Sequence, residues 1–107
     1  MENGLIEKII NALKDELKRD YPDFKGIYFF GSRARGDYND DSDYDLVLVF
    51  DRVIDWRFKD NLRRRVIDYE IDYSILIDSH IYNYQDIIEP ITPFREKVKN
   101  EGIYYDA

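Results

Sequence analysis

Cysteine is absent from this 107-residue sequence, and histidine occurs only once, as His80. Without thiols the chain can form no disulfide bond, no thiolate zinc site and no cysteine nucleophile. A single histidine also excludes a metal site built from several histidines of one chain. The sequence therefore excludes thiol chemistry and the metal sites that are rich in cysteine or histidine.

Long apolar segments are missing as well. The longest uninterrupted apolar run, residues 46–50, is far too short to span a bilayer. Charged side chains at Glu2, Glu7 and Lys8 occupy the region where a signal peptide would need an apolar core. We therefore expect a cytoplasmic protein that does not bind a membrane.

Positive charge is in short supply. Lysine and arginine number 16 against 23 aspartates and glutamates, which gives a formal net charge of −7. A protein that binds DNA or RNA without regard to sequence neutralises phosphates with a basic face. We therefore expect no direct binding of nucleic acid.

The length fits one small domain, residues 1–107, and the apolar share of 44% is ordinary for a folded protein. A chain of this size can bury one core but cannot form two lobes with a cleft between them. A large active site must therefore be shallow or completed by a partner.

Helical periodicity marks several segments. An amphipathic helix is expected over residues 3–20, a second over about 56–66 and a third over about 80–89, with His80 at its start and without a ligand role. A last helix begins with Thr92 as N-cap and Pro93 at the first position, and Gly102 follows its end. The apolar face of the first helix consists of Leu5, Ile6, Ile9, Ile10, Leu13 and Leu17.

Strands are expected between these helices, over residues 27–30, 46–50 and 71–77. The continuous apolar run of the second strand indicates burial on both of its faces. Strands that alternate with helices predict an α/β (α+β) domain with a small mixed sheet flanked by helices.

A turn directly after the first strand has the residues of a phosphate site. Gly31 allows a sharp turn and a close approach of phosphate to the main chain. Ser32 can cap a short helix whose free N–H groups face an anion. Arg33 and Arg35 add permanent positive charge nearby.

Two carboxylates follow at strand spacing. Asp43 and Asp45 lie two residues apart and therefore project from the same face. Carboxylates so close repel each other unless a cation lies between them, and oxygen ligands select Mg²⁺ or Mn²⁺. Asp72, in the expected strand 71–77, is the candidate third carboxylate, and Asp68 is the alternative if that strand reaches back to residue 68.

The string Gly31-Ser32-Arg33-Ala34-Arg35-Gly36, followed by Ser42-Asp43-Tyr44-Asp45-Leu46, resembles the signature of the polymerase-β-like nucleotidyltransferase superfamily. It looks most like the minimal nucleotidyltransferases (MNT), single-domain proteins that commonly serve as antitoxins of HEPN-domain ribonuclease toxins. The resemblance runs along nearly the whole chain.

This resemblance implies a polymerase-β-like fold and a set of site residues. Gly31 and Ser32 would bind the triphosphate of ATP, and two Mg²⁺ ions would be bound by three aspartates. We add three neighbours of the motif to the nucleotide-binding set. The aspartates are Asp43, Asp45 and Asp72, and the added neighbours are Arg33, Arg35 and Ser42.

The resemblance also implies an activity, the transfer of AMP from ATP onto a tyrosine hydroxyl of the partner HEPN toxin, which silences the toxin. With no histidine or lysine in the motif, a carboxylate such as Asp72 would accept the proton of the hydroxyl. Two alternatives stay open: an antitoxin that acts by binding and occlusion alone, and a nucleotidyltransferase that acts on a small-molecule hydroxyl.

Overall fold

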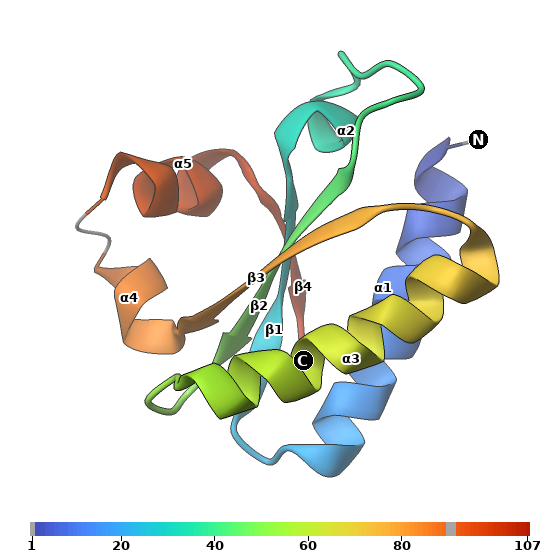
Figure 1. The fold of residues 1–107 in the computed structure, drawn as a ribbon. Coiled ribbons are helices and arrows are strands. Elements are labelled where there is room, and N and C mark those ends of the chain that lie inside the picture. The colour runs from blue at the N-terminus through green and yellow to red at the C-terminus, as the bar shows by residue number, and fades with distance from the viewer. Residues whose placement is uncertain (1, 90–91) are drawn as a thin grey trace.

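The computed structural model describes residues 2–89 and 92–107. Along the chain, helices alternate with strands, as the sequence predicts (Figure 1). The elements are α1 (Glu2–Asp20), β1 (Phe24–Phe30), α2 (Gly31–Arg35), β2 (Tyr44–Phe50), α3 (Trp56–Tyr73), β3 (Ile77–Asn83), α4 (Tyr84–Ile88), α5 (Pro93–Glu101) and β4 (Ile103–Asp106).

The sheet is mixed and has the strand order β3-β2-β1-β4. β1 is antiparallel to both β2 and β4, whereas β2 and β3 are parallel and are connected through α3. Parallel neighbours begin at the same edge of a sheet, and the antiparallel strand β1 ends there. The turn at Gly31 and the first residues of β2 and β3 therefore meet at one end of the sheet.

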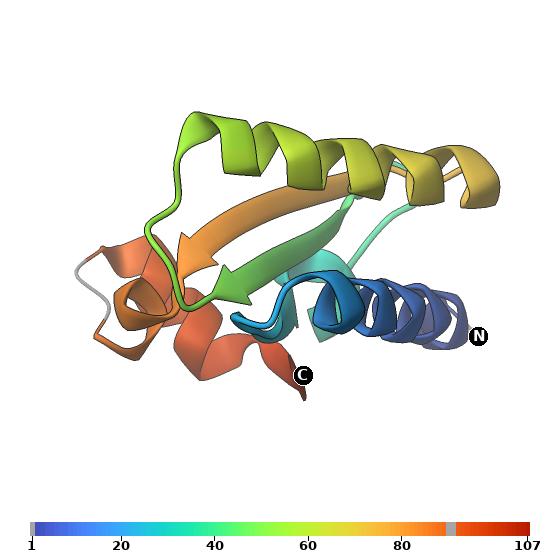
Figure 2. The same cartoon turned by 90° about the horizontal axis from the view of Figure 1, so that it is seen from below.

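Helices cover both faces of the sheet. Figure 1 shows α1 and α3 on one side of the strands and α4 and α5 on the other, and Figure 2 shows the same separation from below. Leu46, Leu48 and Phe50 of β2 pack in the cluster with α1 and α3, and Val47 and Val49 pack in the second cluster with α4 and α5. The expected burial of β2 on both faces is confirmed.

The apolar row of α1 is buried as its periodicity predicts, with Leu5 at the margin of the core. At the far end of the sheet, Phe50 makes edge-on contacts with Tyr21 and Phe58 and a tilted contact with Phe24. α5 begins at the cap that the sequence predicts, because the Thr92 side chain accepts a hydrogen bond from the Arg95 N–H. Within the described part of the chain, no helix combines the length and apolar character that crossing a membrane requires.

The predicted strand 71–77 is wrong. α3 continues to Tyr73 because Leu62 and Val66 are buried on its inner face and Tyr69 and Tyr73 pack beside them, which extends the helical period by two turns. The helix ends at Ser74, which adopts the left-handed conformation at φ 55°.

The predicted helix 80–89 begins too early, because its first residues belong to a strand. Residues 77–83 form β3, in which Ile77 and Ile81 are buried against the core and the backbone pairs with β2. Asn83 caps the shorter helix α4, since its side chain accepts a hydrogen bond from the Gln85 N–H. His80 therefore lies within a strand, not at a helix start.

Replacement of Phe50 by alanine removes a fully buried ring that three other aromatic rings contact. We expect Phe50→Ala to lower the free energy of unfolding by about 3–5 kcal/mol, as is usual for a buried phenylalanine. Chemical denaturation measures the change. Val53→Ala, at a side chain that is 86% exposed, is the control and stays within about 0.5 kcal/mol of the unaltered protein.

Candidate active site

Two carboxylates lie side by side at the end of the sheet where Gly31 follows β1. Asp45 of β2 pairs with Asp78 of β3 in the parallel register, and it also lies opposite Phe30 of β1. Directly paired residues on neighbouring strands project from the same face. Both carboxylates therefore project from the face that α4 and α5 partly cover, where Phe30 packs.

Gly31 is held against Asp45. Its φ is +82°, a conformation that residues with side chains rarely adopt, and a Cβ at this position would overlap the Oδ2 atom of Asp45. Ser32 follows in the first turn of α2. Asp45 is thus in direct contact with the Gly31 turn, which the sequence predicts to be a phosphate site.

Negative charge is crowded at this point. Burial raises the pKa of Asp45 to about 6, and the charges of Asp78 and Asp43 add to the effect, while His80 opposes it. Asp78 is half-exposed, and its Oδ2 atom lies 3.2 Å from Nε2 of His80.

This donor set fits a divalent cation. Carboxylate oxygens are the ligands that Mg²⁺ prefers, and a cation would relieve the repulsion that raises the pKa of Asp45. Over residues 2–89 and 92–107, no three His, Asp or Glu side chains are already gathered around one point. Asp43, exposed just before β2, is the side chain that would complete the set.

The structure separates Asp72 and Asp68 from the site. Both are exposed residues of α3, because this helix continues to Tyr73. The premise that Asp72 shares the sheet with Asp45 is therefore wrong, and Asp78 occupies that place. The sequence signal for this strand is weak, because Ile77 and Ile81 are apolar positions of one face but Ser79 between them is polar.

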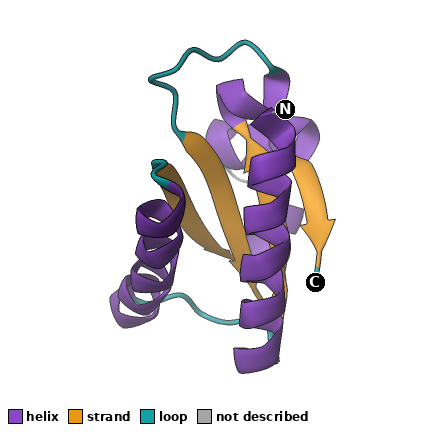
Figure 3. Cartoon of the chain, turned by 90° about the vertical axis from the view of Figure 1, so that its right-hand side faces the viewer, coloured by secondary structure: helices purple, strands orange, loops and turns teal. Residues whose placement is uncertain are grey.

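Arg33 lies within the fold. Its side chain is 7% exposed and its guanidinium lies between the rings of Tyr38 and Tyr44, 4.4 and 4.6 Å from their centres. It donates hydrogen bonds to the main-chain carbonyls of Ser42, at 3.1 Å, and Asp40, at 3.5 Å. Arg33 thus fastens the loop between α2 and β2, which Figure 3 shows extending beyond the strands.

The other two added neighbours also contact this loop. Arg35 is exposed and its Nε atom lies 3.3 Å from Oδ2 of Asp37. The hydroxyl of Ser42 accepts a hydrogen bond from the Asn39 N–H. The structure therefore brings Gly31, Asp45 and Asp78 together, and it gives Arg33, Arg35 and Ser42 contacts that order the loop before Asp43.

A small pocket opens beside Gly31 on the side of α5. It has a volume of about 170 Å³ and combines two aromatic side chains with two cationic ones. Phe30 and Phe94 meet edge to face, with their ring centres 5.5 Å apart. The ring of His80 lies 5.1 Å from Phe94, so the pocket adjoins the partner of Asp78. Its lining consists of Phe30, Gly31, Arg35, Phe94, Lys97 and Val98.

The charge of Asp78 should be detectable in the titration of Asp45. In Asp78→Asn we expect the pKa of Asp45 to fall from about 6 toward the ordinary value, because one neighbouring charge is lost. Carboxyl chemical shifts measured by NMR across the pH range report this value. Asp72→Asn is the matched control, and an equal fall in both variants would contradict the pairing of Asp45 with Asp78.

Stability should also depend on the protonation of Asp45. Its folded pKa of about 6 lies above the ordinary aspartate value of about 3.9, so its contribution is present below about pH 4 and is lost as the pH rises through about 6. We therefore expect Asp45→Asn to raise the unfolding midpoint at pH 7 and to change it little at pH 4. Thermal unfolding at both pH values measures this, and a larger gain at pH 4 would contradict the assignment.

Comparison with known proteins identifies a family and individual relatives of this chain. The family model described as "Nucleotidyltransferase domain" matches residues 10–105. A Methanocaldococcus jannaschii protein named "Putative protein adenylyltransferase MJ0141" is 33% identical over 95 residues, which are 89% of this chain and 85% of the relative. A second protein of that organism, "Putative protein adenylyltransferase MJ0604", is 43% identical over 58 residues, 50% of this chain and 55% of the relative.

Solved structures share the fold. The crystal structure of "a putative nucleotidyltransferase from Sulfolobus solfataricus" superposes with a TM-score of 0.58 at 24% identity, and the match covers 92% of this chain and 77% of that one. A mutant of the toxin-antitoxin complex MntA-HpeT matches with a TM-score of 0.58 at 18% identity, over 97% of this chain and 70% of that one. At these identities the likeness concerns the fold, and it agrees with the expected nucleotidyltransferase fold.

Proposed function

Because this chain belongs to the nucleotidyltransferase domain family, we propose that it is a protein adenylyltransferase that moves AMP from ATP onto a hydroxyl of a partner toxin. In this proposal the modification inactivates the toxin, and the chain acts as its antitoxin. The observation that carries the proposal is the pairing of Asp45 with Asp78 directly beside the Gly31 turn.

Three carboxylates would hold Mg²⁺ in this proposal: Asp43, Asp45 and Asp78. Asp78 takes the role that the sequence analysis expected of Asp72. When bound, two such ions would neutralise the phosphates and make the attacking hydroxyl more acidic. The main chain at Gly31 and Ser32 would bind the phosphates. The absence of a Cβ at Gly31 supports this role, because the phosphates can approach the backbone next to the carboxylates.

The transfer itself is an in-line displacement. The hydroxyl oxygen of the acceptor forms a bond to the α-phosphorus of ATP, the bond from that phosphorus to the oxygen bridging to the β-phosphate breaks, and pyrophosphate leaves. The proton of the hydroxyl passes to a carboxylate. Asp78 is our candidate for that acceptor, because it is half-exposed and adjoins Asp45.

The pocket beside α5 is our candidate for the nucleotide. Phe30 and Phe94 offer aromatic surface for a base, and Arg35 and Lys97 offer positive charge for phosphates. This pocket includes Gly31, so a nucleotide there would have its phosphates beside the carboxylates. The two aromatic residues did not emerge from the sequence motif, because they belong to separate elements that meet only in the fold.

The names of relatives support a protein as the acceptor. Two Methanocaldococcus jannaschii relatives are named as protein adenylyltransferases, and one chain with the same fold belongs to a toxin-antitoxin complex. We propose a HEPN-domain ribonuclease toxin as the partner and a tyrosine hydroxyl as the acceptor. Phosphodiester attachment of AMP would add negative charge where the toxin must bind RNA phosphates, which explains the inactivation.

Carboxylate variants should abolish the transfer. We expect Asp43→Asn, Asp45→Asn and Asp78→Asn each to slow AMP transfer by about a thousandfold or more, since each removes a charge that the reaction centre needs. Asp72→Asn, the matched control on α3, should retain activity within about twofold. Mass spectrometry of a candidate partner toxin, after incubation with this protein, ATP and Mg²⁺, counts the added AMP groups.

The double variant Asp43→Asn, Asp45→Asn separates catalysis from occlusion. If catalysis inactivates the toxin, this variant loses both the mass increase and the protection against RNA cleavage. Full protection by the variant at equal stoichiometry would show that binding alone neutralises the toxin. Transfer to free hydroxyl compounds in preference to the toxin would favour a small-molecule acceptor.

A further inference from the structure

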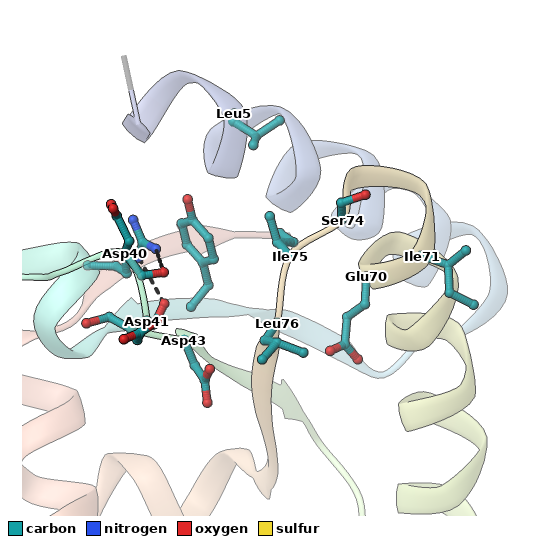
Figure 4. A pocket seen from close by; sticks show the side chains of 12 residues that line it. Leu5, Asp40, Asp41, Asp43, Glu70, Ile71, Ser74, Ile75 and Leu76 are labelled. Atoms are coloured by element: carbon teal, nitrogen blue, oxygen red, sulfur yellow. Dashed lines mark hydrogen bonds between the residues drawn. The ribbon is translucent and has the colours of Figure 1, made fainter.

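A large hollow lies on the side of the sheet end opposite the pocket beside α5, which we call the α5 pocket. It has a volume of about 740 Å³, within the range of about 300–1,000 Å³ that is common for ligand sites. Figure 4 shows it between the loop that carries Asp40 and Asp41, the segment Ser74–Leu76, and Leu5 of α1. Asp43, a residue of the candidate active site, forms part of its wall.

A second, smaller hollow of about 270 Å³ continues this surface along α3. The two hollows share Glu70, and the smaller one includes Ile67 and reaches Asp78. The combined surface, which we call the α3 groove, thus borders the active-site carboxylates at two points, Asp43 and Asp78.

The α3 groove combines exposed apolar side chains with an acidic margin. Ile71 is 70% exposed and Leu76 is 66% exposed, although apolar side chains of this size are usually buried. Carboxylates outnumber cations along the margin of the groove. Among the described residues, its two cations are Arg63, which is exposed in the smaller hollow, and Arg33, whose guanidinium donates a hydrogen bond to the carbonyl of Ser42. The carboxylates of this margin are Asp40, Asp41, Asp43 and Glu70, and the strand residue Asp78 borders the smaller hollow.

We infer that the α3 groove is the docking surface for the acceptor protein, and that it takes a segment with apolar side chains flanked by lysine or arginine. The inference rests on the proposed function, because it assigns the acceptor of that reaction. Acidic side chains at the margin attract such a segment and repel the phosphates of ATP. They also repel a second copy of this chain, whose net charge is −7.

The position of the groove fits the chemistry. In an in-line displacement the attacking oxygen and the leaving pyrophosphate lie on opposite sides of the phosphorus. The α5 pocket, with Arg35 and Lys97, and the α3 groove, with Ile71 and Leu76, open on opposite faces of the sheet at the end where Asp45 lies. A nucleotide in the pocket and a protein hydroxyl from the groove would therefore approach each other at this end of the sheet, where Asp43 lines the groove and Asp45 lies beside Gly31.

The test uses three short fluorescent peptides, each with one tyrosine. The basic probe has leucines along one side of an amphipathic helix and lysines beside them, the acidic probe has glutamates in place of the lysines, and the polar probe has serines in place of the leucines. We expect the basic probe to bind the full chain at least about tenfold more tightly than either of the others, measured by fluorescence anisotropy. Added salt should weaken this binding.

Two groove variants locate the binding. The double variant Ile71→Ser, Leu76→Ser and the single variant Asp41→Lys should each weaken binding of the basic probe by about tenfold. Val53→Ser and Asp15→Lys are the matched controls, at exposed positions outside the groove, and should bind as the unaltered chain does. Thermal unfolding of every variant verifies the fold. Equal binding of the three probes, or equal binding by groove variants and controls, would overturn the inference.

Transfer assays separate this inference from the proposed function. Each protein is incubated with ATP and Mg²⁺ and with either the basic probe or N-acetyltyrosinamide, which is too small to occupy the groove. Groove variants should lose transfer to the probe through a higher KM and keep transfer to the small compound. Transfer to the probe that is insensitive to the groove variants would overturn the groove alone. Groove-dependent binding without transfer to any tyrosine would instead contradict the proposed function.

Discussion

The parallel pairing of β2 with β3 is the constraint on which the site depends. It brings Asp45 and Asp78, which lie far apart in the sequence, to adjacent positions on one face. The same pairing partly buries Asp45 and so raises its pKa to about 6. Stability and the proposed function oppose each other at this point, since the crowding that disfavours ionised carboxylates is also what would favour a cation beside them.

The rest of the fold sustains that pairing. β2 is buried on both faces, with Leu46 and Leu48 against the cluster of α1 and α3 and Val47 against the cluster of α4 and α5. A strand that packs on both faces cannot shift its register by one residue without exchanging its two apolar sets. Two hydrophobic clusters therefore fix where Asp45 lies relative to Asp78 and to the Gly31 turn.

Local patterns in the sequence were sufficient for much of this structure. The helix α1 and the strand β2 could be predicted because each has a clear apolar pattern, the helical period in α1 and the run 46–50 in β2. The start of α5 could be predicted because its cap at Thr92 is a contact between near neighbours in the sequence. The Gly31 turn and the Asp43–Asp45 pair are also local, and the structure keeps Gly31 in contact with Asp45.

The secondary structure of residues 71–83 could not be predicted from local sequence patterns. Ile71, Asp72 and Tyr73 suit a strand by composition, but the packing of Tyr69 and Tyr73 on the core carries α3 through them. β3 is a strand because β2 lies beside it, which is a contact between distant parts of the chain. Asp78, our candidate for the third carboxylate, was missed because the predicted strand was displaced by several residues.

Arg33 gives the site a mechanical property. Its guanidinium extends from α2, directly after the Gly31 turn, and holds the carbonyl of Ser42, directly before Asp43. The backbone that would bind phosphate and the backbone that carries the first carboxylate are thereby joined across the loop by one side chain between two tyrosine rings. Arg33 thus braces the two halves of the candidate site against each other, so a movement of the Gly31 turn would reach the backbone at Asp43 through this side chain as well as along the loop.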